Sequence, residues 1–129
     1  MVWYFDWFSL LYVLVCEAFM KIFINEKDVT PVRYKDYSFK EMLGKKNGCL
    51  AGCRTGVLIY TQEEYRQNGV HDDQEGFFVL SGSGSAMVGD KEFYLEPGVC
   101  FIVPPGTNHS IKKDTSCSCI KLFFFHAAV

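Results

Sequence analysis

Two short segments of this 129-residue chain carry side chains suited to binding a metal. The first begins at His71, reaches Glu75 four residues later through a polar turn, and leads through an apolar stretch to Gly82. The second, residues 98–109, contains a Pro-Pro-Gly turn and ends at His109. Two neutral imidazoles and one carboxylate suit zinc, iron, nickel, manganese or copper, and they leave positions open for water or a bidentate oxygen ligand. We therefore predict a divalent metal held by His71, Glu75 and His109.

A third imidazole is a possible fourth ligand. Side chains alternate between the two faces of a strand, so residues 120, 122, 124 and 126 share one face, and that face is apolar up to His126. If this face points into a barrel, His126 lines the cavity; a surface or packed position is the alternative. The polar residues 72–74 either form the turn between His71 and Glu75 or reach the metal through water.

Short strands separated by Gly and Pro turns must position these groups. Residues 37–43 fit either a strand or a short helix, a further strand is expected to carry His71, and Gly89-Asp90 predicts a hairpin. Strands are expected at residues 21–24, 56–61, 76–80, 85–88, 91–95, 99–103, 110–113 and 118–126, the last two as a final hairpin. Many short strands with almost no helix predict an all-β sandwich or barrel.

Composition narrows the class of protein further. The length suits one domain with one core, and 16% aromatic residues favour pleated sheets. A net charge of -2 without a Lys/Arg cluster gives no support for binding nucleic acid. The six cysteines lack Cys-x-x-Cys spacing, and we interpret them as reduced thiols in a cytoplasmic protein.

The N-terminal residues 1–19 are intensely apolar and their first charge is Asp6, which does not fit a signal peptide. The apolar run is shorter than the ~20 residues that span a bilayer. Because Met20 begins a plausible protein start, we hypothesise that residues 1–19 are an upstream extension of the reading frame and that residues 20–129 form a single domain. The alternatives are an extra element packed on an apolar face or a partner subunit, and a membrane anchor.

Over residues 55–126 the chain resembles the cupin superfamily. His71, Glu75 and Gly82 fit the first cupin motif, whereas Gly98, Pro104, Gly106 and His109 fit the second. The resemblance implies a double-stranded β-helix, or jelly-roll, cupin barrel with a metal inside. Cupins commonly dimerise by sheet packing, so a homodimer is expected.

The chain departs from the cupin pattern at three positions. Gly69 stands where the first His of the motif's His-x-His pair belongs, Glu63 replaces its leading Gly, and Lys113 replaces the terminal Asn of the second motif. The remaining set of two His and one carboxylate resembles the triad of non-haem iron oxygenases. The loss of one ligand equally permits weak metal binding or none.

Three functional classes follow, and fold alone does not choose among them. The first is a metal enzyme acting on a small oxygen-rich molecule by dioxygenation, isomerisation or epimerisation, with the metal as Lewis acid and template. The second is a non-catalytic sensor or binding module for a small carboxylate or sugar. The third is a metal-free structural barrel.

Overall fold

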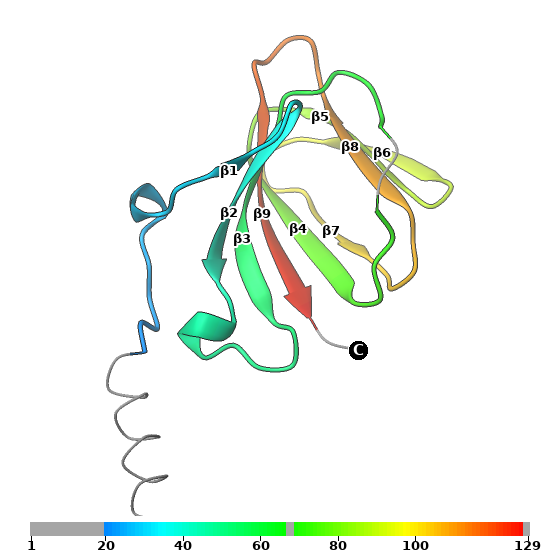
Figure 1. Ribbon diagram of the computed structural model, residues 1–129. Coiled ribbons are helices and arrows are strands. Elements are labelled where there is room, and N and C mark those ends of the chain that lie inside the picture. The colour runs from blue at the N-terminus through cyan, green and yellow to red at the C-terminus, as the bar shows by residue number, and fades with distance from the viewer. Residues whose placement is uncertain (1–19, 67–68, 128–129) are drawn as a thin grey trace, which may run out of the picture.

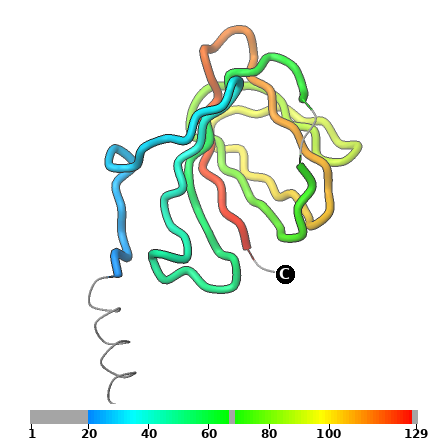
Figure 2. The backbone as a smooth tube through the Cα atoms, in the orientation of Figure 1, coloured from blue at the N-terminus to red at the C-terminus, as the bar shows by residue number. Residues whose placement is uncertain are grey.

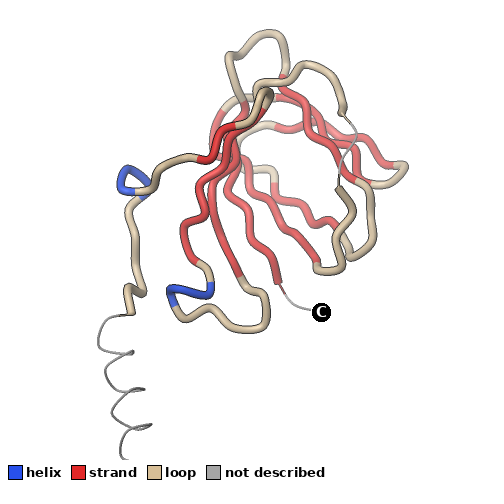
Figure 3. Tube along the Cα trace, in the orientation of Figure 1, coloured by secondary structure: helices blue, strands red, loops and turns tan. Residues whose placement is uncertain are grey.

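The structure of the protein is a computed structural model that describes residues 20–66 and 69–127. The hypothesis that residues 1–19 are an upstream extension concerns a segment outside these ranges and stays a prediction. Figure 3 shows that the described part is built almost wholly of strands and loops, with two short helical turns.

Nine strands and two 3-10 helices make up the described chain (Figure 1). The helices are η1 (Glu26–Asp28) and η2 (Lys45–Asn47). The strands are β1 (Val32–Arg33), β2 (Tyr37–Leu43), β3 (Arg54–Tyr60), β4 (Gln74–Ser81), β5 (Gly84–Val88), β6 (Lys91–Leu95), β7 (Cys100–Val103), β8 (His109–Lys113) and β9 (Ile120–Ala127). The segment 37–43, for which the sequence allowed helix or strand, is therefore strand β2.

The strands form two antiparallel sheets. One has six strands in the order β1-β2-β3-β9-β4-β7, and the other has three in the order β6-β5-β8. The predicted hairpin at Gly89-Asp90 is present as β5 and β6, with Val88 paired to Lys91. Figure 1 shows the two sheets facing each other, so the expected all-β jelly roll is confirmed.

The core lies between the sheets and follows from strand alternation. On β9 every second residue from Ile120 to His126 is buried, and the residues between them are half-buried. The neighbouring strands supply Leu58, Phe77 and Val103, and the smaller sheet contributes apolar side chains from the opposite side. Because β9 is apolar on both faces, it is stable only where both faces are covered, and it lies in the middle of the larger sheet.

One end of the larger sheet is covered by the segment before β1. Nζ of Lys121 on β9 donates a hydrogen bond of 2.9 Å to Glu26, and Nζ of Lys40 on β2 donates one of 2.9 Å to the Glu26 carbonyl. In Figure 2 this blue segment runs along one side of the barrel. The predicted strand at residues 21–24 is wrong: these residues have no ladder partner and join the fold through the Asn47 amide, which donates to the Lys21 carbonyl.

Two further expectations, the final hairpin and the strand at His71, are wrong. Residues 110–113 and 118–126 do not pair as a hairpin, because β8 pairs with β5 whereas β9 pairs with β3 and β4. The segment that links β3 to β4 instead runs beside β8, where the Lys113 amide donates to the Gln62 carbonyl at 2.8 Å. His71 does not lie on a strand but in the loop before β4. Within residues 20–66 and 69–127, no helix is long and apolar enough to cross a membrane.

Candidate metal centre

Glu75 is the centre of a polar cluster inside the barrel. It lies near the start of β4, where the register pairs it with His126 on β9 and with Val103 on β7. Its odd-numbered position places it on the same face as the core residue Phe77, and only 6% of its surface is exposed. A carboxylate this deeply buried requires several polar partners to offset its lost hydration.

All three histidines of the chain supply those partners. Nε2 of His71 lies 3.0 Å from Oε2 of Glu75, and Nε2 of His109 lies 3.3 Å from the same oxygen. Nε2 of His126 lies 3.2 Å from Oε1. The imidazoles come from a loop, from β8 of the smaller sheet and from β9 of the larger sheet, so the cluster joins both sheets.

Asp73 contacts two of the three imidazoles through the ring nitrogens that do not face Glu75. Its Oδ1 lies 2.8 Å from Nδ1 of His71, and its Oδ2 lies 2.8 Å from Nδ1 of His126. An N–H at Nδ1 that donates to Asp73 leaves Nε2 as the nitrogen that faces Glu75. A carboxylate in this position fixes the tautomer and the ring orientation of histidines that bind metals.

Backbone turns bring the two motif segments together. Gly98 and Gly106 have positive φ angles of 96° and 70°, which glycine adopts without strain. The Gly106 amide donates a 2.8 Å hydrogen bond to the His71 carbonyl, which fastens the His71 loop to the turn that leads into β8. His109 begins β8 directly after that turn. The Pro-x-Gly turn therefore positions both His71 and His109.

The cluster also changes the acid–base properties of its members. Burial opposes ionisation of Glu75, but the hydrogen bond from His109 and the charges of the three imidazoles hold its pKa below the usual value. Burial likewise opposes ionisation of Asp73, yet contact with His126 and His71 lowers its pKa. Burial disfavours a charged His71, but the Asp73 carbonyl and the two carboxylates raise its pKa. Both acids are therefore anionic near neutral pH.

The cluster opens into a cavity of about 640 Å³. The cavity is lined by Tyr34, Lys35, Asp36, Tyr37, Phe39, Arg54, Leu58, Tyr60, Gln62, Arg66, Gly69, His71, Glu75, His109, Phe124 and His126. Burial and the charge of Glu75 raise the pKa of Tyr60, so its phenol is protonated and can donate a hydrogen bond. This volume is large enough for a small organic molecule beside the cluster.

The distances within the cluster fit a bound ion. Two donors about 2.1 Å from one ion lie about 3.0–3.4 Å apart when they subtend about 90–109° at it. The donor atoms of His71, Glu75 and His109 all lie within 4.8 Å of one another, and those of His71, Asp73 and His126 form a second such group. Imidazole nitrogen and carboxylate oxygen are donors that suit zinc, iron, nickel and manganese.

The structure thus brings together the four side chains that the sequence pointed to, and it adds two more. The apolar face of β9 points into the barrel and carries His126 to the cavity. Gly69 lines the same cavity, and a Cβ added there would meet nothing within 4 Å. Sequence reasoning treated Asp73 only as a turn residue or a partner through water, and it missed Arg54. Only the pairing of β3 with β9 places Arg54 beside His126.

Comparison with families of known proteins identifies one match. The family model described as "Cupin domain" matches residues 57–123, which is 67 of the 129 residues. No curated protein matches the chain.

Several solved structures share the fold. The crystal structure of FeII HppE is 18% identical, with a TM-score of 0.72 over 83% of this chain and 60% of that chain. A predicted oxalate decarboxylase from Thermotoga maritima is 14% identical, with a TM-score of 0.71 over 82% of this chain and 98% of that one. The polyketide cyclase RemF from Streptomyces resistomycificus is 15% identical, with a TM-score of 0.67 over 80% and 76%.

At these identities the solved structures demonstrate a common fold alone. The chain spans about three fifths of the length of the HppE structures that it matches. Functions do not transfer at this distance, because one fold hosts many activities.

Proposed function

This chain belongs to the cupin family, and we propose that it is a metal-binding small cupin that binds or acts on a small oxygen-rich molecule inside its barrel. One observation carries the proposal: all three histidines of the chain meet the buried carboxylate of Glu75 at the wall of an open cavity. A cluster with only a structural role does not need access to a cavity of about 640 Å³.

We assign the metal to His71, Glu75 and His109, with His126 as the fourth ligand. Support for the first three comes from their mutual distances and from their positions in the two motif segments. Support for His126 comes from its contact with Glu75 and from Asp73, which directs Nε2 of His126 toward Glu75 in the same way as Nε2 of His71. His126 thereby takes the place of the imidazole that Gly69 lacks.

The donor set is compatible with zinc, iron, nickel or manganese. When bound, such an ion supplies a Lewis acid and a template for an oxygen-containing ligand. The protein supplies the surroundings: the Tyr60 phenol and the Gln62 amide face the cavity as polar groups, and Leu58 and Phe124 give it an apolar wall.

A specific observation favours a second candidate, a barrel that needs no metal. Throughout the described residues, every buried side-chain nitrogen and oxygen has a hydrogen-bond partner. The contacts of 3.0–3.3 Å between the imidazoles and Glu75 are also normal lengths for hydrogen bonds. A non-catalytic binding module is the corresponding candidate in which the metal is present but no reaction follows.

Metal content tests the proposal. Protein purified without added metal is analysed for zinc, iron, nickel and manganese, alongside His109→Ala and the control Asn108→Ala, which changes an exposed neighbour. We expect close to one ion per chain in the wild type and in the control, and a large loss in His109→Ala. Substoichiometric metal that His109→Ala leaves unchanged contradicts the proposal and favours the metal-free barrel.

A binding experiment separates an enzyme from a binding module. If a small molecule binds to the metal-loaded protein and remains unconverted after long incubation, the chain is a binding module. If it is converted, the chain is an enzyme, and the His109→Ala variant, purified in the same way and matched in protein concentration, serves as the control for contaminating activity.

We also propose a cytoplasmic homodimer. The outer face of the larger sheet exposes apolar side chains on neighbouring strands, with Phe78 42%, Leu80 43% and Ile102 46% exposed, and a second copy of the chain would cover them. The five described cysteines are free thiols, which suits a reducing compartment.

A further inference from the structure

We propose that Arg54 binds an oxyanion, a carboxylate or a phosphate-type group, of the molecule that enters the cavity, and that the ligand of this barrel is therefore a small organic anion. The inference rests on the proposed function, because it names the class of ligand that is held beside the metal centre. It depends on the position of Arg54, on its partners and on the charge of the cavity.

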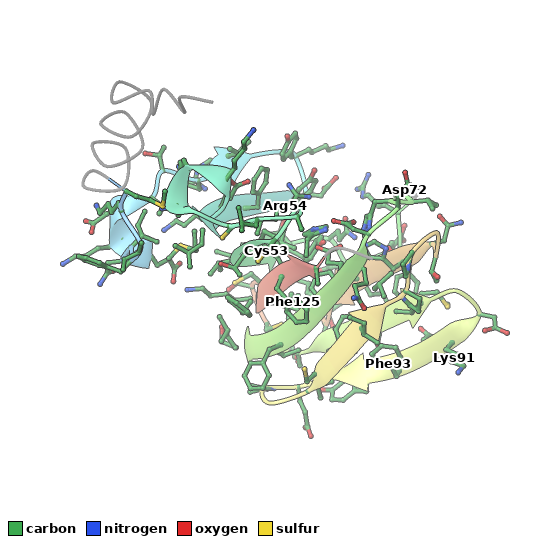
Figure 4. All side chains as sticks on the ribbon, turned by 90° about the horizontal axis from the view of Figure 1, so that it is seen from below. Cys53, Arg54, Asp72, Lys91, Phe93 and Phe125 are labelled. Atoms are coloured by element: carbon green, nitrogen blue, oxygen red, sulfur yellow. The ribbon has the colours of Figure 1, made fainter. Side chains whose placement is uncertain are left out.

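Strand register places Arg54, an exposed residue, at the edge of the cavity. It begins β3 and pairs with His126 on β9, which in turn pairs with Glu75 on β4. Alternation puts it on the same face of β3 as the core residue Leu58. Figure 4, which looks into the barrel from below, shows Arg54 next to the red strand β9. Three adjacent strands thus present a guanidinium, an imidazole and a carboxylate in one row.

The guanidinium has no carboxylate partner among the described residues. Its Nη2 lies 3.2 Å from Nε2 of His126, and no acidic side chain of residues 20–66 or 69–127 lies within ion-pair distance of it. In contrast, the other arginine of the cavity, Arg66, is neutralised by Asp36 at 3.2 Å. Arg54 has five N–H donors in a planar fork, and one contact to an imidazole leaves most of them free for a ligand.

The cavity as a whole favours a negative ligand. Its wall carries the cationic side chains of Lys35, Arg54 and Arg66 against the anionic side chains of Asp36 and Glu75. A divalent ion at the cluster adds further positive charge. A carboxylate or phosphate group binds a guanidinium through two parallel hydrogen bonds, and these are stronger than bonds between neutral groups.

The position of Arg54 also fixes where the anion would lie. Nη2 of Arg54 and Oε1 of Glu75 are each 3.2 Å from the same atom, Nε2 of His126. An oxygen held by Arg54 therefore lies beside the donor atoms of the metal centre. The rest of the molecule would face Leu58 and Phe124, which suits an apolar body carrying an acidic group.

Calorimetric titration with three related probes tests this proposal. Benzoate, phenyl phosphate and benzyl alcohol share an aromatic body and differ in the group that meets Arg54. Each is titrated into zinc-loaded and metal-free full-length protein, as wild type, Arg54→Met and Arg33→Met. Arg33 is an exposed arginine of β1 outside this cavity, so Arg33→Met is the matched control.

We expect wild type to bind at least one anionic probe about tenfold or more tightly than benzyl alcohol. Arg54→Met should lose about tenfold or more of that affinity, whereas Arg33→Met should keep it. A preference for benzoate identifies a carboxylate ligand and a preference for phenyl phosphate a phosphorylated one, and both support the proposal. Equal binding of all three probes, no binding of either anion, or an unchanged affinity in Arg54→Met overturns it.

The same experiment separates this inference from the proposed function. Failure of zinc to bind the wild type contradicts the metal centre, and the probe affinities of the metal-free protein then test Arg54 alone. Zinc binding with an unchanged anion affinity in Arg54→Met contradicts only the role of Arg54. The circular dichroism spectrum and melting temperature of each variant show whether a loss of binding reflects loss of the fold.

Discussion

A carboxylate oxygen of Asp73 lies 2.8 Å from Nδ1 of His126, although the two residues are 53 positions apart in the chain. The contact joins the loop before β4 to the last described strand. Its counterpart on His71 has the same length of 2.8 Å, so one side chain orients two imidazoles. The cluster therefore includes a carboxylate that orients its candidate metal ligands, which is a feature of metal sites that bind tightly.

Asp73→Asn tests this role of the carboxylate. Because the amide keeps only one acceptor oxygen where the carboxylate has two, at least one ring loses its fixed orientation, and we expect zinc affinity to fall about 10- to 100-fold with the fold retained. A competition titration against a chromophoric chelator measures the affinity. Asp72→Asn, which removes an exposed neighbouring carboxylate, should leave it unchanged. Equal effects of the two substitutions would mean that only local net charge matters.

A second prediction concerns His126, which we propose as the fourth ligand. His126→Ala should weaken zinc binding by about 10- to 100-fold or more, because it removes both a donor atom and a partner of Glu75. Gly69→His in the same protein should recover a measurable part of the loss, since position 69 lines the cavity and has open space for a side chain. If Gly69→His strengthens binding in wild type but not in His126→Ala, His126 does not occupy the missing position.

The pKa shifts predict how the stability of the metal-free protein depends on pH. Asp73 and Glu75 have lowered pKa values, so their stabilisation is complete above about pH 4.3 and is lost as pH falls through their folded values. His71 has a raised pKa, so its contribution is complete below about pH 6.5 and is lost as pH rises through its folded value. Denaturant unfolding in the presence of a chelator should show greatest stability between these limits.

Glu75→Gln provides the control for that pH profile. An uncharged side chain at position 75 removes the attraction to all three imidazoles. The decline in stability toward low pH and toward high pH should therefore become shallower. A wild-type free energy of unfolding that rises steadily from pH 5 to pH 8 would show that His71 is not held in its charged form.

The tight packing around Gly56 leads to a prediction about stability. It lies between Arg54 and Leu58 on the inner face of β3, and a Cβ there would come 2.6 Å from the Phe124 ring and into contact with the Lys40 carbonyl. We expect Gly56→Ala to cost about 1–3 kcal/mol of unfolding free energy, because overpacking must displace the ring. Gly69→Ala, which meets nothing within 4 Å, should stay within about 0.5 kcal/mol of wild type. Chemical denaturation measures both.

The exposed apolar face gives a prediction about assembly. Phe78→Lys places a charge on the outer face of β4, where we propose that two chains meet, and sedimentation should show a shift from dimer toward monomer. Tyr94→Lys changes an exposed aromatic residue on β6 of the other sheet and should leave the dimer intact. A wild-type protein that sediments as a monomer at micromolar concentration contradicts the dimer.

The sequence allowed much of the fold to be predicted, because local patterns determine it. Turn residues and alternation located β3, β4, β7 and the β5–β6 hairpin to within a few residues. The Pro-x-Gly turn before His109 was equally readable. The predicted final hairpin was wrong for a physical reason: β9 is apolar on both faces, and the need to cover both draws it into the larger sheet, away from β8.

The parts of the site that could not be predicted depend on contacts between distant residues. His71 was expected on a strand, but its carbonyl is bound by the Gly106 amide, so the segment becomes a loop fastened to a turn. Arg54 is an unremarkable polar residue at the start of a strand until the register sets it opposite His126. Asp73 has no distinguishing feature in the sequence, because its contact with His126 depends on the pairing of β9 with β4.

The central position of β9 has a consequence for how the protein is made. During synthesis β3 and β4 leave the ribosome before the strand that separates them, and each lacks its common neighbour until residues 120–127 emerge. The pairs β2–β3 and β4–β7 can form earlier, but the larger sheet is completed only when β9 joins them, and contacts across such long sequence separations form slowly. In the interval the nascent chain exposes unpaired apolar strand edges, and chaperones that bind such edges are expected to associate with it most strongly just before β9 appears.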